Sequence, residues 1–196
     1  MVKNKLDFNK RPLSYSSISS FEYNKEKWYE TYILGKRQSS RQLTFGSSID
    51  LRLQNDPTFL PMIPRCPMLQ HEMVVSFNGI KLVGKPDAID LEKYILRDYK
   101  TGVVKWDKKR ADETDQFTMY LFLVYIKYKI RPENFKCFID WMPTCENDSF
   151  EIGFMEPIED HILQLETSRS MKDIINFGAK IKRIVKEMEE YVKKHK

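Results

Sequence analysis

Two aspartates and a lysine are predicted to meet on one face of a β-hairpin. Asp87 lies on the strand before the polar pair Glu92-Lys93, and Asp98 and Lys100 lie on the strand after it. If the turn is centred on this pair, the numbers of facing residues sum to 185, so Asp87 faces Asp98 and Lys100 follows on the same face. Facing like charges destabilise a sheet, and a divalent cation bound by both carboxylates removes the repulsion. The pattern therefore predicts a metal site.

The position of Lys100 beside the two carboxylates indicates hydrolytic chemistry. An ammonium group near a bound cation can orient or acidify a metal-bound water, or offset the charge of a phosphorane-like transition state. The alternative interpretation is a solvated sheet face, because ion pairs between surface side chains are common. In that case the partners of Asp87 and Asp98 are Lys85, Lys100 or Arg97.

Two polar side chains on the next predicted helix, over residues 112–128, support a site. Gln116 and Tyr120 are four residues apart and therefore share a helix face. Polar groups on an otherwise apolar helix need a partner or a site. For Tyr120 the alternative is core packing with a satisfied hydroxyl group.

Hydrophobic periodicity predicts the sheet and helices that position these residues. Asn78-Gly79 is the preferred two-residue hairpin turn, and four prolines between residues 57 and 67 predict an irregular crossing. The order of elements predicts one α/β domain over residues 1–196, with a mixed central sheet flanked by helices. The predicted helices cover residues 14–34, 45–53, 112–128 and 158–196, the last as one or two helices, and the predicted strands cover 72–77, 80–91, 94–101, 135–141 and 149–154.

The composition is typical of a globular protein without a membrane-spanning segment. Of the 196 residues, 41% are hydrophobic and 13% aromatic, which is enough for a full core. The longest run without Asp, Glu, Lys or Arg covers residues 116–126, about half of what a spanning helix needs. Cys66, Cys137 and Cys145 lack paired spacing, so we expect no disulfide framework, no zinc ribbon and an intracellular, cytoplasmic location.

Positive charge is concentrated in two parts of the chain. The net charge is +5, and residues 1–41 carry nine Lys and Arg against four Asp and Glu. A second cluster follows the hairpin, and such patches suit a polyanionic partner. The alternative is an ordinary solvated surface. The second cluster consists of Lys100, Lys105, Lys108, Lys109 and Arg110, opposed only by Asp107.

Five short motifs, in order, resemble the PD-(D/E)XK nuclease superfamily and in particular its RecB-like branch. That branch includes the nuclease domains of recombination helicase-nucleases, lambda-type exonucleases and CRISPR-associated iron-sulfur nucleases. The resemblance extends over residues 13–128, and the ordered set is more specific than any single motif. The motifs are Leu13-Ser14-Tyr15-Ser16, Phe45-Gly46-Ser47-Ser48-Ile49, Gly84 with Asp87, Asp98-Tyr99-Lys100-Thr101-Gly102, and Gln116 with Tyr120.

The resemblance implies a restriction-endonuclease-like core and Mg- or Mn-dependent cleavage of DNA phosphodiester bonds. In such a site Lys100 would position the attacking water, while Gln116 and Tyr120 would fix the lysine or grip the DNA backbone. The metal ligands implied by the resemblance are Asp87, Asp98 and the carbonyl of Tyr99. The residues expected to contact DNA are Ser14, Tyr15, Ser16, Lys105, Lys108, Lys109, Arg110 and Tyr120.

The chain departs from the family pattern in two places. Asp50 stands where the family usually has a metal-binding histidine, and a carboxylate, as the harder ligand, would shift the preference toward Mg. The alternative for Asp50 is a surface helix residue, and Glu72 could add a further carboxylate. The iron-sulfur subgroup needs one cysteine in its N-terminal helix and three near its C-terminus, but residues 14–34 contain none and none follows Cys145. We therefore expect no iron-sulfur cluster.

These observations favour a stand-alone metal-dependent deoxyribonuclease that acts as an exonuclease on DNA ends or single strands. We expect a role in recombination, repair or the processing of viral or mobile-element DNA, without a membrane partner. The chain has no helicase motif, so a helicase, recombinase or other DNA-processing protein could supply its substrate. The alternative is an inactive nuclease-fold subunit that binds DNA or acts as a scaffold. RNA is a further alternative substrate, because metal-assisted hydrolysis is indifferent to the 2′-hydroxyl group.

Overall fold

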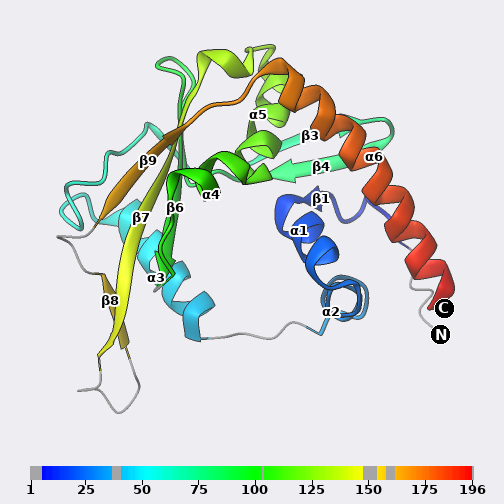
Figure 1. Cartoon of the computed structure of the whole chain (residues 1–196), viewed down its shortest axis with the longest axis horizontal. Coiled ribbons are helices and arrows are strands. Elements are labelled where there is room, and N and C mark those ends of the chain that lie inside the picture. The colour runs from blue at the N-terminus through cyan, green and yellow to red at the C-terminus, as the bar shows by residue number, and fades with distance from the viewer. Residues whose placement is uncertain (1–5, 37–40, 103, 148–153, 158–161, 196) are drawn as a thin grey trace.

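The computed structural model describes residues 6–36, 41–102, 104–147, 154–157 and 162–195 (Figure 1). Its strands form two mixed sheets, and helices flank them. The predicted α/β class is therefore confirmed. Across these ranges, no helix is long and apolar enough to cross a membrane.

The smaller sheet has three strands in the order β1-β4-β3. β3 (Met73–Phe77) and β4 (Ile80–Gly84) are antiparallel, and β1 (Leu13–Ser14) joins β4 in parallel. Asn78 and Gly79 have φ values of 49° and 77°, the left-handed conformation that a tight two-residue hairpin turn requires. The predicted Asn78-Gly79 turn is confirmed.

The larger sheet carries the predicted hairpin and the strands around it. Its order is β2-β5-β6-β7-β8, and β9 also pairs with β7. β6 and β7 are parallel, whereas the other neighbours are antiparallel. The strands are β2 (Met68–Leu69), β5 (Ala88–Asp90), β6 (Ile95–Gly102), β7 (Lys136–Asn147), β8 (Phe154–Pro157) and β9 (Leu163–Thr167).

The chain leaves the smaller sheet and enters the larger one within three residues, Lys85 to Asp87. The predicted continuous strand over residues 80–91 is therefore wrong, because β4 ends at Gly84 and β5 begins at Ala88, in a different sheet. Pro86 explains the break, since proline has no N–H to donate to a ladder. As a result, Asp87 lies at the junction of the two sheets.

The structure has helices in all four predicted regions, but the last begins at Met171 and not at residue 158, and α3 extends beyond the predicted 45–53 at both ends. The predicted helix over residues 14–34 is divided into two α-helices and a π-helix, and that over residues 112–128 is preceded by a separate short helix. Ser14 caps the first helix by accepting a hydrogen bond from the backbone N–H of Ser17. The helices are α1 (Tyr15–Tyr23), α2 (Lys25–Trp28), η1 (Tyr29–Ile33), α3 (Arg41–Asn55), α4 (Lys108–Glu113), α5 (Asp115–Tyr128), η2 (Pro132–Asn134) and α6 (Met171–Lys194).

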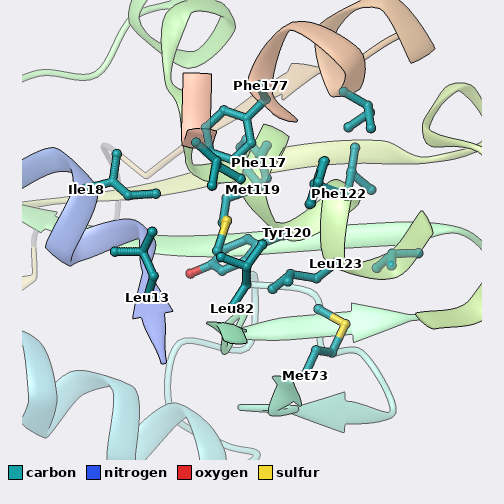
Figure 2. Packing of buried hydrophobic residues seen from close by; sticks show 14 of the residues in the cluster. Leu13, Ile18, Met73, Leu82, Phe117, Met119, Tyr120, Phe122, Leu123 and Phe177 are labelled. Atoms are coloured by element: carbon teal, nitrogen blue, oxygen red, sulfur yellow. The ribbon is translucent and has the colours of Figure 1, made fainter. Parts of the chain in front are cut away.

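Helix α5 lies at the centre of the main core. Figure 2 shows its side chains Met119, Tyr120 and Leu123 packed close to Leu82 of β4. Gly84 permits this close approach, because a Cβ atom there would collide with Leu123 and crowd the ring of Tyr120. The helix that carries the candidate site residues is therefore fixed against the smaller sheet.

One predicted element has the wrong type. Residues 163–167 were expected to be helical, but they form strand β9, antiparallel to β7. Leu163, Leu165 and Thr167 alternate along this segment, which is the two-residue period of a strand. Most of the predicted strand over residues 149–154 lies outside the described residues, and β8 begins only at Phe154.

Candidate active site

The predicted register of the hairpin is confirmed. β5 and β6 pair Ala88 with Arg97 and Asp90 with Ile95, and both pairs sum to 185. Asp87 and Asp98 lie one residue beyond the last of these pairs. Asp98 and Lys100 lie on one face of β6, toward α5, while Arg97 and its alternating neighbours lie on the other.

The Asp87 carboxylate accepts a hydrogen bond at each of its oxygens. Gln70 Nε2 donates to Oδ1 at 2.8 Å, and the backbone N–H of Tyr99 donates to Oδ2 at 2.7 Å. On the ladder register Tyr99 would face Pro86, which has no N–H for the Tyr99 carbonyl. The break at Pro86 thus leaves the Tyr99 carbonyl without its usual ladder partner, and the Tyr99 backbone lies next to the Asp87 carboxylate.

The Asp98 carboxylate, which is 2% exposed, lies in a network with Lys100 and Gln116. Its Oδ2 is ion-paired with the Lys100 ammonium group, and its Oδ1 accepts a hydrogen bond from Gln116 Nε2 at 2.6 Å. Lys100 Nζ also donates to Gln116 Oε1 at 2.9 Å. This fixes the orientation of the Gln116 amide, because a flip would place its NH₂ group against an ammonium and its oxygen against a carboxylate.

Tyr120 extends this network toward the junction of the two sheets. Gln116 Nε2 donates to the Tyr120 hydroxyl at 2.9 Å, and that hydroxyl donates to the carbonyl of Lys85 at 3.4 Å. Burial raises the pKa of Tyr120 well above its ordinary value, and the nearby Asp98 and Asp87 charges add to this effect. Tyr120 is therefore a hydrogen-bonding group and not a source of negative charge.

The charges in this site perturb one another. Burial raises the pKa of Asp87 well above its usual range, and repulsion from Asp98 and Asp50 adds to the shift. Burial lowers the pKa of Lys100, but the attraction of Asp98 and Asp87 outweighs it and the net shift is upward. Lys100 therefore stays charged, and a further cation would stabilise the ionised Asp87.

Asp50 lies on α3, near the other two aspartates. Burial and then repulsion from Asp98 raise its pKa to about 6, partly offset by Lys100. In the part of the chain that the structure describes, however, no three His, Cys, Asp or Glu side chains are gathered as a metal-binding group. The role of Asp50 as a third carboxylate ligand therefore stays a prediction. Glu72 is exposed.

The residues present fit a hard divalent cation with two carboxylates and one carbonyl. Asp87 and Asp98 face each other in the continued register of β5 and β6. Both side chains are largely removed from solvent, and each carboxylate retains oxygen lone pairs. Oxygen donors of this kind suit Mg²⁺ and Mn²⁺. Asp98 already has one positive partner in Lys100, whereas Asp87 has only neutral hydrogen-bond donors.

The N-terminal helix brings one of the expected DNA-contacting residues near Lys100 and Tyr120. The Tyr15 hydroxyl is 3.4 Å from Thr114 Oγ1, and Tyr15 acts electrostatically on both Lys100 and Tyr120. Ser14 is the helix cap, and its Oγ lies 3.2 Å from Ser16 Oγ.

The basic cluster after the hairpin is partly neutralised by its own helix. On α4, Lys108 is ion-paired with Asp112, and Lys109 Nζ lies 3.8 Å from a Glu113 carboxylate oxygen. Arg110 lies over the Trp106 ring at 4.0 Å. The full positive patch expected from the sequence is therefore reduced, although Lys105 and Arg110 stay exposed.

Arg169 holds the N-terminal end of α5, where Gln116 lies. Its side chain is 6% exposed and donates to the carbonyl oxygens of Ala111 and Thr114 at 3.1 and 2.7 Å, and to Thr118 Oγ1 at 2.9 Å. Thr114 in turn accepts a hydrogen bond from the backbone N–H of Gln116. Residues of the C-terminal third therefore support the candidate site.

Sequence reasoning missed Gln70 and a buried ion pair on the far face of β6. Arg97 Nη1 lies 2.7 and 2.9 Å from the two carboxylate oxygens of Asp140, and its guanidinium lies 4.4 Å from the Phe138 ring centre. Burial raises the pKa of Asp140 to about 6, although Arg97 opposes the shift. The sequence contained an indication of this pair, because Asp140 is a charged residue within the otherwise apolar run 137–142.

Comparison with known proteins identifies a shared fold. A protein named "Putative exonuclease" from Eubacterium rectale is 15% identical, with a TM-score of 0.58, over 93% of this chain and 83% of that one. The structure of SSO0001 is also 15% identical, with a TM-score of 0.46, over 90% of this chain and 74% of that one. No family model and no curated protein matches the chain. The chain therefore has the α/β fold of the Eubacterium protein.

Proposed function

We propose that this chain is a metal-dependent deoxyribonuclease of the RecB-like branch of the PD-(D/E)XK superfamily. The observation that carries the proposal is the single hydrogen-bonded network formed by Asp98, Lys100, Gln116 and Tyr120, with Asp87 next to it, directly before β5. A solvated ion pair would not need a buried carboxylate held by both a lysine and a glutamine. The motif order and the fold shared with a protein named as an exonuclease support the same function.

The residues of the network have distinct roles in this proposal. Asp87, Asp98 and the Tyr99 carbonyl would hold Mg²⁺ or Mn²⁺, which would supply a Lewis acid and an acidified water. Lys100 Nζ would orient the attacking water and offset negative charge on the phosphate in the transition state. Gln116 keeps Lys100 and Asp98 in their relative positions, since its amide bonds both.

An exonuclease acting on ends or single strands is favoured over a site-specific endonuclease. Sequence-specific cleavage requires contacts to base edges, usually from an additional module that enters a groove. After the two sheets and their supporting helices are assigned, the described residues leave no such module. The proposal includes DNA processing in recombination, repair or mobile-element replication, with duplex opened by a partner protein.

A second candidate function has its own supporting observation. Asp50 replaces the usual histidine, and among the described residues no three His, Cys, Asp or Glu side chains are gathered as a metal-binding group. A nuclease-fold subunit that binds DNA without cleaving it would be compatible with such a site. Both candidates predict DNA binding that weakens as salt rises, because phosphate contacts release counterions.

Cleavage of end-labelled linear and circular DNA in Mg²⁺, Mn²⁺ or EDTA separates the two candidates. The proposed nuclease releases labelled products from linear DNA with metal and none in EDTA, and Asp98→Asn abolishes the release. Circular single-stranded DNA as a second substrate distinguishes dependence on ends from dependence on single strands. Salt-dependent DNA binding without cleavage under any metal would support the inactive subunit.

A further inference from the structure

Gln70 has a backbone conformation that is unusual for its residue type. It follows β2, and its φ is 49°, in the left-handed region that side chains other than Gly and Asn rarely adopt. Residues held in this region persist only where the surrounding contacts determine them, and they are frequent at functional sites. The contacts of Gln70 therefore indicate what fixes this conformation.

Gln70 faces Asp87 and binds it twice. β2 and β5 pair Met68 with Ile89 and Leu69 with Ala88, and this register places Gln70 opposite Asp87. The Gln70 backbone N–H donates to the Asp87 carbonyl at 2.9 Å, and Gln70 Nε2 donates to Asp87 Oδ1 at 2.8 Å. The first bond continues the ladder, whereas the second reaches the carboxylate itself.

The second bond removes a rotation that the carboxylate would otherwise have. The last torsion of an aspartate side chain joins a tetrahedral to a planar carbon, and its energy profile is broad. The N–H of Tyr99 holds only Oδ2, at 2.7 Å, so one oxygen could still move about that contact. With Gln70 on Oδ1 both oxygens are fixed, and each keeps a lone pair for another ligand.

We propose that Gln70 is a positioning residue that holds the Asp87 carboxylate in the orientation required to bind a divalent cation. This inference rests on the proposed metal-dependent nuclease function. Gln70 would serve Asp87 as Gln116 serves Asp98, where an amide nitrogen lies 2.6 Å from Oδ1. The two carboxylates are then each held by one glutamine, Gln70 directly after β2 and Gln116 on α5.

Two substitutions separate positioning from a merely structural role. Gln70→Gly removes the donor and also relieves the left-handed backbone, so the melting temperature in EDTA should stay the same or rise. Gln70→Met removes the donor but keeps the chain length and the backbone strain, so the melting temperature should stay the same or fall. Both variants should bind Mg²⁺ and Mn²⁺ about 10- to 100-fold more weakly, the usual cost of losing a residue that orients a metal ligand.

Cation affinity is measured by calorimetry and by the rise in melting temperature with added Mg²⁺ or Mn²⁺, neither of which requires turnover. Asn78→Gly is the matched control, because Asn78 has the same φ of 49° but lies in the β3–β4 turn. It should leave cation affinity and DNA cleavage unchanged. DNA affinity in EDTA should be the same for the wild type and both Gln70 variants.

Wild-type cation affinity in both Gln70 variants would overturn the inference, provided that the wild type binds the cation and cleaves DNA. In that case the proposed function stands and only the role of Gln70 fails. A wild type that neither binds Mg²⁺ or Mn²⁺ nor cleaves DNA would overturn both. Weaker cation binding only in Gln70→Met, with wild-type affinity in Gln70→Gly, would show that the amide donor is not needed for cation binding once the backbone is relaxed, and would also overturn the inference.

Discussion

The amide oxygen of Gln116 accepts a hydrogen bond from Lys100 Nζ at 2.9 Å, and its amide nitrogen donates to Asp98 Oδ1 at 2.6 Å. One side chain therefore bridges the two members of an ion pair that are only two residues apart on β6. The bridge restricts the ion pair to one relative orientation of the ammonium and carboxylate groups.

Asp98→Asn should abolish cleavage and preserve DNA binding. The substitution keeps the shape of a side chain that is 2% exposed, but it removes the charge that would hold a cation. We expect a fall in kcat of at least about 100-fold, a typical effect of removing one electrostatic element of an active site. DNA affinity in EDTA should be unchanged or a few-fold tighter, because a negative charge facing phosphate is lost. Fluorescence anisotropy and end-label release measure the two quantities.

Asp56→Asn is the control for that experiment, since Asp56 is an exposed carboxylate that binds Thr58 at the end of α3. It should cleave DNA like the wild type. Cleavage by Asp98→Asn at the wild-type rate would remove Asp98 from the proposed site.

Lys100→Met should destabilise the metal-free protein and abolish cleavage. The methionine keeps most of the apolar length of the lysine but leaves the Asp98 carboxylate buried without its positive partner. Breaking a buried ion pair in this way costs up to about 3 to 5 kcal/mol of unfolding free energy. Urea unfolding in EDTA measures the loss, and the double variant with Asp98→Asn should recover most of it. No loss in the single variant would show that the pair is effectively solvated.

Asp50→Asn should make the metal-free protein more stable at pH 7.5. The pKa of Asp50 is raised to about 6 by burial and by Asp98, so its ionised form costs folding free energy above that pH. Between about pH 6 and the ordinary value of 3.8 the folded chain takes up a proton that the unfolded chain does not, and the cost disappears as pH falls. The substitution should remove this pH dependence.

Thermal melting in EDTA at pH values from 7.5 to 5 tests whether the wild type becomes more stable as pH falls. Each kcal/mol of free energy gained by removing the buried and repelled charge should raise the melting temperature by about 2 to 4 °C in a protein of this size. Glu72→Gln, at an exposed carboxylate, is the control and should leave the profile unchanged. A lower melting temperature of Asp50→Asn at pH 7.5 would contradict the repulsion.

The buried Arg97–Asp140 pair should behave as a structural unit. Asp140→Ala leaves the Arg97 side chain, which is 7% exposed, without its carboxylate and should cost about 3 to 5 kcal/mol in urea unfolding. The double variant Arg97→Met with Asp140→Leu replaces both charges by apolar groups and should recover most of this loss. A double variant as unstable as Asp140→Ala would show that the pair is net favourable.

The hairpin that carries the candidate site could be predicted because its determinants are local. The polar pair Glu92-Lys93 and the alternation of the flanking strands set the register. In this register the numbers of facing residues sum to 185, which places Asp87 opposite Asp98. Buried Asp90 supports the turn by accepting hydrogen bonds from the N–H groups of Glu92 and Lys93. The register of this hairpin could therefore be predicted without knowing how distant parts of the chain pack.

Other features depend on contacts that no local pattern encodes. Gln70 reaches Asp87 only because β2, after a proline-rich crossing, joins the edge of β5. Pro86 indicated that the strand is interrupted there. A proline does not indicate, however, whether the next strand stays in the same sheet or joins another one. β9 was missed because its five residues were absorbed into the longer amphipathic pattern of the helix that follows.

The Arg169 contacts have a consequence for the chain during its synthesis. Ribosomes synthesise a chain from its N-terminus at about 5 to 20 residues per second, so the hairpin and α5 emerge before Arg169 does. Until then the carbonyls of Ala111 and Thr114 lack the guanidinium that holds them in the finished protein. The α4–α5 junction, and with it the position of Gln116, is completed only when residue 169 has left the ribosome. If the chain is the proposed nuclease, a nascent chain whose residue 169 is still inside the ribosome is expected to lack cleavage activity.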